Sequence, residues 1–325
     1  MDSSSPVIYV RYNIPKKYIE KIKALGATVL FDPWQFGKKE PAVNFDLSEC
    51  DIILTLGLMD PLTIKNNAPK LKWVQSLSVG LDALLHEETI KSNLLITNTK
   101  GCTSIPIAEH TVAMISGFAR GLPTMLRNQN KRIWSNTDIQ DLDGATIGII
   151  GYGEIGKEIA KRCKALGMHV VGCRKRPSIT TSNDPADEVV GLEQVDDVIK
   201  NADFLVLALP STKETYQFIN KEKLRLMKPS AYLINIGRGN TIAEADLLEV
   251  LTAQRIKGAA LDVFEVEPLP SESPFWALEN VIISPHNAYY SPKSMDRYMD
   301  IFLENVTRFK EGKELLNLVN KELGY

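Results

Sequence analysis

Short apolar runs alternate with amphipathic segments along this chain, and the alternation occurs in two successive sets. In the first set, five runs rich in β-branched and aromatic residues are typical of strands. They lie at residues 7–10, 28–31, 52–55, 73–75 and 95–97. The patterns at residues 16–25 and 81–90 predict helices between them. Such alternation predicts a parallel sheet whose strands are joined by helical crossovers.

The second set begins near Asp143 and repeats the pattern. Its expected strands are residues 146–150, 169–173, 204–208, 232–236, 259–261 and 281–283, and its expected helices are residues 155–166, 221–227 and 243–251. The apolar-periodic segment 105–120 predicts a helix that connects the two sets. Residues 295–310 predict a last helix that returns to the first set of strands.

The order of these elements predicts an α/β fold of two domains, the second inserted into the first. We expect residues 1–104 and 291–325 to form one domain and residues 105–290 to form the other. A length of 325 residues is enough for two domains with a full core each. Two connections between the domains, without a low-complexity linker, predict hinged closure over a cleft.

Composition and charge are typical of a globular protein and give no sign of a nucleic acid or membrane partner. Hydrophobic residues make up 44% of the chain and charged residues 24%, which is ordinary for a soluble globular protein. The formal net charge of -2 gives no reason to expect nucleic acid or an anionic membrane as a partner. No apolar run is long enough to cross a bilayer.

The cysteines and the first residues of the chain bear on its location. Cys50, Cys102, Cys163 and Cys173 are scattered, without the spacing of a disulfide frame or a zinc site. The start of the chain lacks the basic and apolar regions of a signal peptide. We therefore expect reduced thiols, no bound metal and a cytoplasmic protein.

A glycine run reading Gly-Tyr-Gly-Glu-Ile-Gly occupies residues 151–156, directly after an apolar strand and at the start of a helix. This is the context that a dinucleotide-binding fingerprint requires. Gly151 permits the tight turn, Gly153 lets the backbone approach a pyrophosphate, and Gly156 lets helix and strand pack closely. Because glycine turns of this kind also occur without a ligand, the strand and helix around the run carry the prediction.

Three cations follow the next strand: Arg174, Lys175 and Arg176. Sites for NAD usually place an acidic residue there, roughly 20 residues beyond the glycine run, to bind the ribose 2′-hydroxyl. A guanidinium group instead suits the 2′-phosphate of NADP. The cations favour NADP(H) over NAD(H), and the alternative is a solvated basic turn.

Arg238 follows a buried-looking strand and lies between two glycines, Gly237 and Gly239, which we expect to let a ligand approach closely. The carboxyl ends of parallel strands face the crevice where ligands bind in open α/β sheets. A guanidinium group there suits a carboxylate and can polarise an adjacent carbonyl. The alternative is a structural salt bridge.

His286 also comes directly after an expected strand, and Pro285 stiffens the turn. A carboxylate hydrogen-bonded to one ring nitrogen would fix the tautomer and favour the protonated ring, which can donate a proton to a carbonyl oxygen. Glu265 and Glu267 are both candidates, and spacing alone does not choose between them. The other three histidines lie in helical or strand patterns and receive no role.

Taken together, these segments resemble the D-isomer-specific 2-hydroxyacid dehydrogenase family over most of the chain. The likeness includes the substrate loop at residues 78–82, the start of the hinge helix at 108–111, and the segments 262–268, 273–276 and 283–286. The resemblance implies a flavodoxin-like substrate domain and a Rossmann-like cofactor domain. At Arg174 the chain departs from the NAD-using members and is similar to the NADPH-linked glyoxylate/hydroxypyruvate reductases.

The resemblance also implies roles for residues at matching positions. Arg238 would bind substrate, His286 would be the acid/base and Glu267 its partner, and the backbone of Ser78, Val79 and Gly80 would bind a carboxylate. The expected cofactor-binding residues are Gly151, Gly153, Glu154, Ile155, Gly156, Arg174, Lys175, Arg176, Pro210, Thr215, Ile236, Gly237, Asp262 and Ala288.

The implied activity is reduction of a small 2-oxo acid by NADP(H), or by NAD(H), to a D-2-hydroxy acid. The family is usually homodimeric, with contacts expected around a long helix near residues 105–127 and the loop that holds Trp134. Leu58, Leu77, Tyr289 and Tyr290 are candidates for the substrate side-chain pocket by position alone.

Three other proteins of this fold remain as alternatives. A dinucleotide-sensing corepressor keeps the same three residues, but long disordered tails are missing here. Formate dehydrogenases pair the histidine with glutamine, where this chain has Glu267. A phosphoglycerate dehydrogenase is the third, although the chain ends near its last expected helix and we expect no separate regulatory domain.

Overall fold

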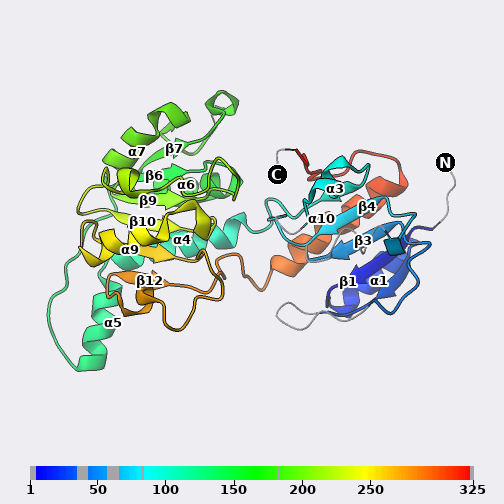
Figure 1. The fold of residues 1–325 in the computed structure, drawn as a ribbon, viewed down its shortest axis with the longest axis horizontal. Helices are drawn as coiled ribbons and strands as arrows, with labels where there is room; N and C mark the ends of the chain where they lie inside the picture. Colours follow the sequence, from blue (N-terminus) through cyan, green and yellow to red (C-terminus); the bar gives the residue numbers. More distant parts are fainter. Residues whose placement is uncertain (1–4, 35–42, 57–65, 82–83, 182, 323–325) are drawn as a thin grey trace. The chain divides into compact units, whose positions relative to one another are not determined.

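The computed structural model describes residues 5–34, 43–56, 66–81, 84–181 and 183–322. The chain divides into two compact units, Met1–Cys102 with Pro292–Tyr325, and Thr103–Ser291 (Figure 1). Each unit is built on its own parallel β-sheet flanked by helices. The predicted α/β class with two such domains is therefore confirmed. No helix in the described parts of the chain is long and apolar enough to span a membrane.

The first unit contains a five-stranded parallel sheet in the order β2-β1-β3-β4-β5. Its strands are β1 (Val7–Arg11), β2 (Thr28–Phe31), β3 (Ile52–Thr55), β4 (Trp73–Ser76) and β5 (Leu95–Thr97). The described part of this unit includes the helices α1 (Lys16–Ala24), α3 (Glu87–Lys91) and α10 (Ser294–Lys310). Alternate residues of β1 pack on opposite faces, because successive side chains of a strand point to opposite sides. Ile8 and Val10 pack with α1 and α10, whereas Tyr9 packs into the other core.

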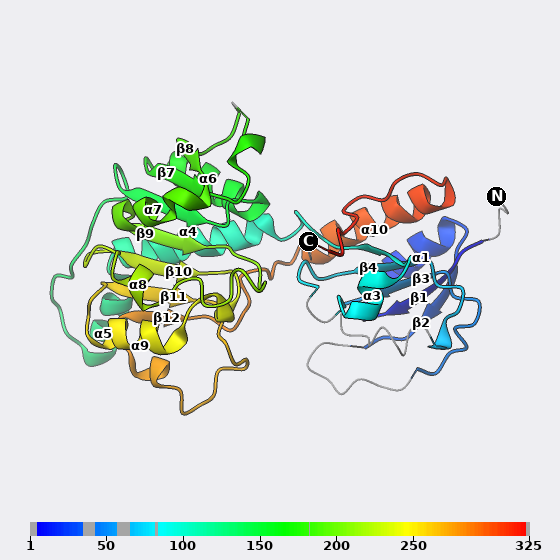
Figure 2. The same cartoon turned by 45° about the horizontal axis from the view of Figure 1, so that its top comes forward.

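The second unit contains a seven-stranded parallel sheet in the order β12-β11-β10-β9-β6-β7-β8, seen side by side in Figure 2. Its strands are β6 (Thr146–Ile150), β7 (His169–Cys173), β8 (Glu188–Val190), β9 (Phe204–Leu207), β10 (Tyr232–Asn235), β11 (Gly258–Leu261) and β12 (Val281–Ile283). Its α-helices are α4 (Ser104–Ala119), α5 (Leu122–Lys131), α6 (Glu154–Ala165), α7 (Val195–Asn201), α8 (Lys221–Leu224) and α9 (Glu244–Thr252).

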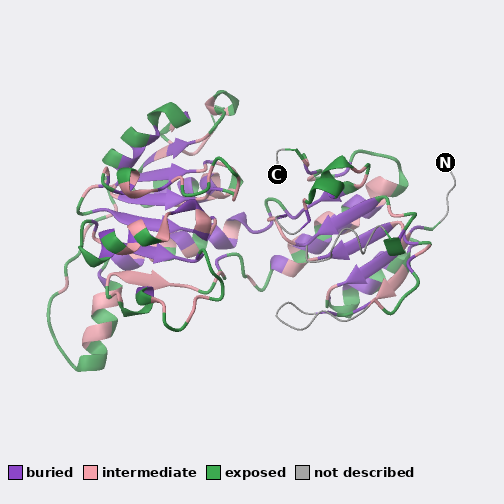
Figure 3. Ribbon diagram, viewed as in Figure 1, coloured by how far each residue is buried: buried purple, intermediate pink, exposed green. Residues whose placement is uncertain are grey.

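Both faces of this sheet are covered, which is why its central strands are continuous apolar runs. Every residue of β9, β10 and β11 is buried, and these strands are purple in Figure 3. Leu205 and Leu207 pack with α7, α8 and α9, whereas Phe204 and Val206 pack with α4 and α6.

The order of strands reverses direction at β6, which lies between β7 and β9. Ligands of open α/β sheets bind outside the carboxyl ends of the strands at such a switch point. The glycine run begins directly after β6. The topology therefore places the predicted cradle where the sheet favours a ligand.

Two expected helices differ from the structure. Among the described residues of the segment 81–90, the helix α3 begins only at Glu87, after His86 adopts an extended backbone, and Leu81 and Leu84 are buried. The helix expected near residues 105–127 is two helices, because the chain turns at Gly121, whose φ of +66° ends α4 and begins α5. In addition, the short elements β8 and α7 were not predicted.

Candidate active site

The three predicted catalytic segments follow three neighbouring strands of the second unit. Arg238 comes after β10, Asp262 directly after β11, and His286 after β12. Residues of β10 pair with β11, and residues of β11 pair with β12, all in parallel. The carboxyl ends of these strands therefore present the three segments along one edge of the sheet.

His286 and Glu267 are in direct contact. Nδ1 of His286 lies 2.7 Å from Oε2 of Glu267, and Oε1 of Glu267 accepts a hydrogen bond of 2.9 Å from the main-chain N–H of Phe264. The His286 and Glu267 side chains are 41% and 34% exposed, so both can be reached from solvent. Because a carboxylate only accepts, Nδ1 of His286 carries the hydrogen and Nε2 is left to exchange a proton with a substrate.

Opposing effects act on the pKa of Glu267. Burial raises it, but the hydrogen bonds from His286 and from the Phe264 N–H, with the charges of His286 and Arg238, outweigh burial and leave the pKa below its usual value. The carboxylate is therefore ionised throughout the neutral range. Because the Arg238 charge is one of the causes of the lowered Glu267 pKa, that guanidinium lies within electrostatic reach of the pair.

The turn that carries Arg238 packs against the segment that leads to Glu267. A Cβ atom at Gly239 would lie 1.9 Å from the carbonyl carbon of Phe264, so only glycine fits there. At Gly237 a Cβ would lie 2.6 Å from the carbonyl oxygen of Leu209. In both cases the close neighbour is the protein's own backbone, which gives these glycines a structural reason, and the approach of a ligand to them stays a prediction.

Asp262 and Ala288 belong to the turn around His286. The Asp262 carboxylate accepts hydrogen bonds from the Ser284 hydroxyl and from the N–H groups of Asn287 and Ala288. Nε2 of His110, on α4, lies 3.1 Å from the Ser284 hydroxyl. His110 and Ser284 have no role predicted from sequence, since nothing in their spacing shows that α4 reaches this turn.

The glycine run forms a tight turn between β6 and α6. Gly151 has a φ of +93°, and a Cβ there would lie 2.5 Å from the carbonyl oxygen of Ala208. Gly153 directly precedes α6, and the nearest atom to a Cβ at that position is 4.0 Å away. Glu154, Ile155 and Gly156 make the first turn of α6. This open space before a helix N-terminus fits a pyrophosphate.

The three cations after β7 differ in their surroundings. Within the described residues Arg174 makes no ion pair, and its Nη1 is buried without a hydrogen-bond partner. Nζ of Lys175 lies 2.8 Å from a carboxylate oxygen of Glu214, whereas Arg176 is exposed. A buried guanidinium nitrogen without a partner is costly, so Arg174 is the cation best suited to receive a phosphate group.

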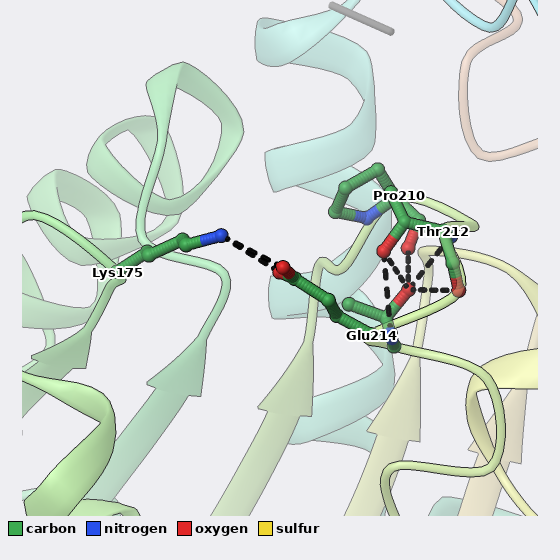
Figure 4. A network of polar contacts seen from close by, with 5 residues as sticks. Lys175, Pro210, Thr212 and Glu214 are labelled. Carbon is green, nitrogen blue, oxygen red and sulfur yellow. Dashed lines mark hydrogen bonds and ion pairs between the residues drawn. The ribbon is translucent and has the colours of Figure 1, made fainter. Parts of the chain in front are cut away.

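Lys175 reaches from the segment after β7 to the loop after β9, which holds Pro210, Thr212 and Glu214 (Figure 4). In that loop the Thr215 hydroxyl donates to the Pro210 carbonyl at 2.6 Å and accepts from the Thr212 N–H at 2.8 Å. Thr215 therefore shapes the loop. Ile236, directly after β10, is buried and lies in the core that α4 and α6 cover.

The residues of the predicted substrate loop lie in the first unit. Ser78, Val79 and Gly80 follow β4 in the first unit, where the Ser78 N–H donates to the Ser76 hydroxyl and the Asn98 side chain donates to the Val79 carbonyl.

The candidates for the substrate pocket differ in exposure. Leu77 is buried in the core of the first unit, Tyr290 is exposed, and the Tyr289 ring meets the His286 ring edge-on at 6.3 Å. Leu58 lies outside the described residues.

The sheet, the glycine cradle and the paired histidine define a dinucleotide-dependent oxidoreductase of the α/β class. The family described as "D-isomer specific 2-hydroxyacid dehydrogenase, NAD binding domain" matches residues 112–288. The chain is 32% identical to a glyoxylate reductase of Korarchaeum cryptofilum over 326 residues, which cover 98% of this chain and 97% of that protein. The chain belongs to the D-isomer specific 2-hydroxyacid dehydrogenase family and is an NAD(P)-dependent oxidoreductase.

Solved structures show the same architecture. A D-isomer specific 2-hydroxyacid dehydrogenase from Xanthobacter autotrophicus Py2, in complex with NADPH and MES, matches with a TM-score of 0.85 and 27% identity, covering 99% of this chain and 100% of that one. An NADPH-dependent glyoxylate/hydroxypyruvate reductase from Sinorhizobium meliloti, in complex with NADP and sulfate, matches with a TM-score of 0.82 and 26% identity, covering 99% and 100%.

Proposed function

We propose that this enzyme reduces a small 2-oxo acid of the glyoxylate or hydroxypyruvate kind to the D-2-hydroxy acid, with Arg238, Glu267 and His286 as its catalytic residues. The observation that carries the proposal is the 2.7 Å contact between His286 and the ionised Glu267, within electrostatic reach of Arg238. The glyoxylate reductase from Korarchaeum cryptofilum supports the choice of substrate class.

Each residue has a distinct task. A reduced nicotinamide, when bound, would supply the hydride that the carbonyl carbon receives. The Arg238 guanidinium binds the substrate carboxylate and polarises the adjacent carbonyl. Nε2 of the His286 imidazolium donates a proton to the carbonyl oxygen, and the Glu267 carboxylate stabilises the charge that the ring carries before the transfer. Oxidation of the hydroxy acid reverses the proton transfer, with neutral His286 as the base.

The proposed role of the substrate loop rests on the family likeness alone. Backbone amides of Ser78, Val79 and Gly80 would bind the substrate carboxylate, and this role stays a prediction. The proposed domain roles follow the same likeness: residues 1–104 and 291–325 bind substrate, and residues 105–290 bind the dinucleotide. A cytoplasmic location also stays a prediction, supported by four free, buried cysteines.

NADP(H) is the proposed cofactor, with NAD(H) as the weaker one. Arg174 lies after β7 without an ion-pair partner in the described chain, while Lys175 is held by Glu214. We infer that Arg174 binds the 2′-phosphate, that Lys175 and Arg176 contribute charge, and that Gly151 to Gly156 hold the pyrophosphate. The NADPH and NADP complexes of the two solved relatives support this choice.

A panel of 2-oxo acids assayed with NADPH and with NADH tests both the activity and the cofactor. We expect turnover of small 2-oxo acids with a higher kcat/KM for NADPH. Because hydrogen bonds to charged groups contribute roughly 1.5–3 kcal/mol each, Arg174→Asp should lower kcat/KM for NADPH about 10- to 100-fold and spare NADH. The exposed Arg225→Asp controls for the change of charge. A clear NADH preference in the unmodified enzyme would refute the proposed cofactor.

The proposed assembly is a homodimer that buries the arm of residues 122–139 against a second copy. No residue of α5 is buried, and the helix is pink and green in Figure 3. Large apolar side chains are exposed along the arm: Leu122, Met125, Leu126, Ile133, Trp134 and Ile139. Contiguous exposed apolar side chains of this kind mark interaction sites.

Sedimentation equilibrium should give the mass of a dimer for the unmodified chain. The double variant Leu126→Asp with Trp134→Ala should shift the protein toward monomers, because it places charge in, and removes area from, an apolar interface. Trp276→Ala, which removes an exposed tryptophan elsewhere, should leave the mass unchanged. If the double variant still had the mass of a dimer, the interface would lie outside the arm.

A further inference from the structure

The turn that carries His286 has a conformation that other residues must maintain. His286 has a φ of +49°, in the left-handed region that residues with a Cβ rarely adopt. Its main-chain N–H donates to the carbonyl oxygens of Asp262, at 2.8 Å, and Ser284, at 3.0 Å. Because such a backbone persists only when its surroundings determine it, the contacts of this turn decide where the imidazole lies.

The Asp262 side chain holds this turn on both sides of His286. It is 3% exposed, and its Oδ1 accepts from the Ser284 hydroxyl at 2.6 Å and from the Asn287 N–H at 3.1 Å. Its Oδ2 accepts from the Ala288 N–H at 3.1 Å. A buried carboxylate with these three donors fixes the residues before and after the imidazole at once.

The direction of the hydrogen bonds extends this network to α4. A serine hydroxyl has one hydrogen, and the Ser284 hydroxyl gives it to the Asp262 carboxylate, which only accepts. The Ser284 oxygen must therefore accept from Nε2 of His110, 3.1 Å away. The same nitrogen lies 3.8 Å from Oδ1 of Asp262. His110 thus carries its hydrogen on Nε2 and ends a chain that runs His110 to Ser284 to Asp262.

We propose that His110 is a positioning residue, which acts through Ser284 and Asp262 to hold the His286 turn so that the imidazole stays paired with Glu267. The inference rests on the proposed acid/base role of His286. His110 makes this contact from the second turn of α4, so the helix, and not only the strand ends, determines the position of the proton donor. Without the N–H of His110, the Ser284 hydroxyl loses a donor and the turn gains freedom.

His110→Leu tests this role against His110→Gln, whose amide keeps a donor near the Nε2 position. We expect His110→Leu to lower kcat about 10- to 100-fold, because a small misplacement of a reacting group has an effect of this order. The Kd for NADPH, measured by fluorescence titration, should stay unchanged, and His110→Gln should recover most of the lost kcat. The solvent deuterium isotope effect on kcat should rise in His110→Leu, because proton transfer becomes slower.

Ser284→Ala provides a second variant that removes only one hydroxyl. It should lower kcat in the same way, and the double variant His110→Leu with Ser284→Ala should be little worse than either single variant, because both interrupt one chain. His169→Leu, which changes a histidine that pairs with Asp187 on β7, is the matched control and should leave kcat unchanged.

A kcat within twofold of the unmodified enzyme in either His110→Leu or Ser284→Ala would overturn the proposal. A loss that His110→Gln does not recover, or that comes with weaker NADPH binding, would also overturn it by showing a general structural role. If the proposed acid/base role of His286 were itself wrong, His286→Ala would stay active. An inactive His286→Ala with a normal His110→Leu refutes only the positioning role.

Discussion

Replacing His286 with alanine should lower kcat for 2-oxo acid reduction about 10²- to 10⁴-fold, the range that general acid–base catalysis contributes. The substitution removes the ring that lies 2.7 Å from Glu267 and with it the proton donor for the carbonyl oxygen. In the unmodified enzyme the lowered pKa of Glu267 leaves it ionised, so His286 and not Glu267 holds the proton to give at neutral pH. The Kd for NADPH should change little.

The matched control is His169→Ala, since His169 lies on β7 and pairs with Asp187. Both variants are compared with the unmodified enzyme by steady-state kinetics and by fluorescence titration with NADPH. A His286→Ala enzyme with near-normal kcat would show that another group supplies the proton.

Arg238→Ala should lower kcat/KM for the oxo acid about 10²- to 10⁴-fold. Two hydrogen bonds from a guanidinium to a carboxylate contribute roughly 3–6 kcal/mol together, at 1.5–3 kcal/mol each. Arg238→Lys should recover only part of the loss, because an ammonium keeps the charge but not the planar fork. Arg238 also helps to lower the pKa of Glu267, so part of the loss should appear in kcat.

Arg225→Ala is the control for Arg238→Ala, because Arg225 is an exposed arginine at the end of α8. The kinetics of the three arginine variants are measured with one oxo acid at saturating NADPH. If Arg238→Ala retains kcat/KM within threefold of the unmodified enzyme, the guanidinium does not bind the carboxylate.

The strands of this protein were predictable because most are buried on both faces. Continuous apolar runs such as β6 and β10 admit few other interpretations. The edge strand β8 was missed, since only one of its three residues is buried and its pattern is short. The helix expected at residues 81–90 was placed too early because Leu81 and Leu84 are apolar and fit a helical period, whereas α3 begins only at Glu87.

Residues of the site could be predicted from sequence only where a side chain suited to catalysis comes shortly after an expected strand. Arg238 and His286 were found in this way, and the choice between Glu265 and Glu267 needed the family likeness. His110 could not be found, because its contact with Ser284 joins residues 174 positions apart in the sequence. Such contacts depend on how α4 packs on the sheet, which local patterns do not encode.

The pH dependence of reduction, in the unmodified enzyme and in Glu267→Gln, tests the paired proton donor most directly. Because the Glu267 pKa is lowered, its negative charge is present beside the imidazole at neutral pH and above. The rate of the unmodified enzyme should fall as the pH rises and the imidazolium is lost. In Glu267→Gln, which keeps a hydrogen-bond acceptor but no charge, the rate should be lower than in the unmodified enzyme across the pH range, because the ring has lost the carboxylate that stabilises its positive charge. Rates that stay flat to about pH 9, or that are equal in the two enzymes, would show that a His286–Glu267 pair does not supply the proton.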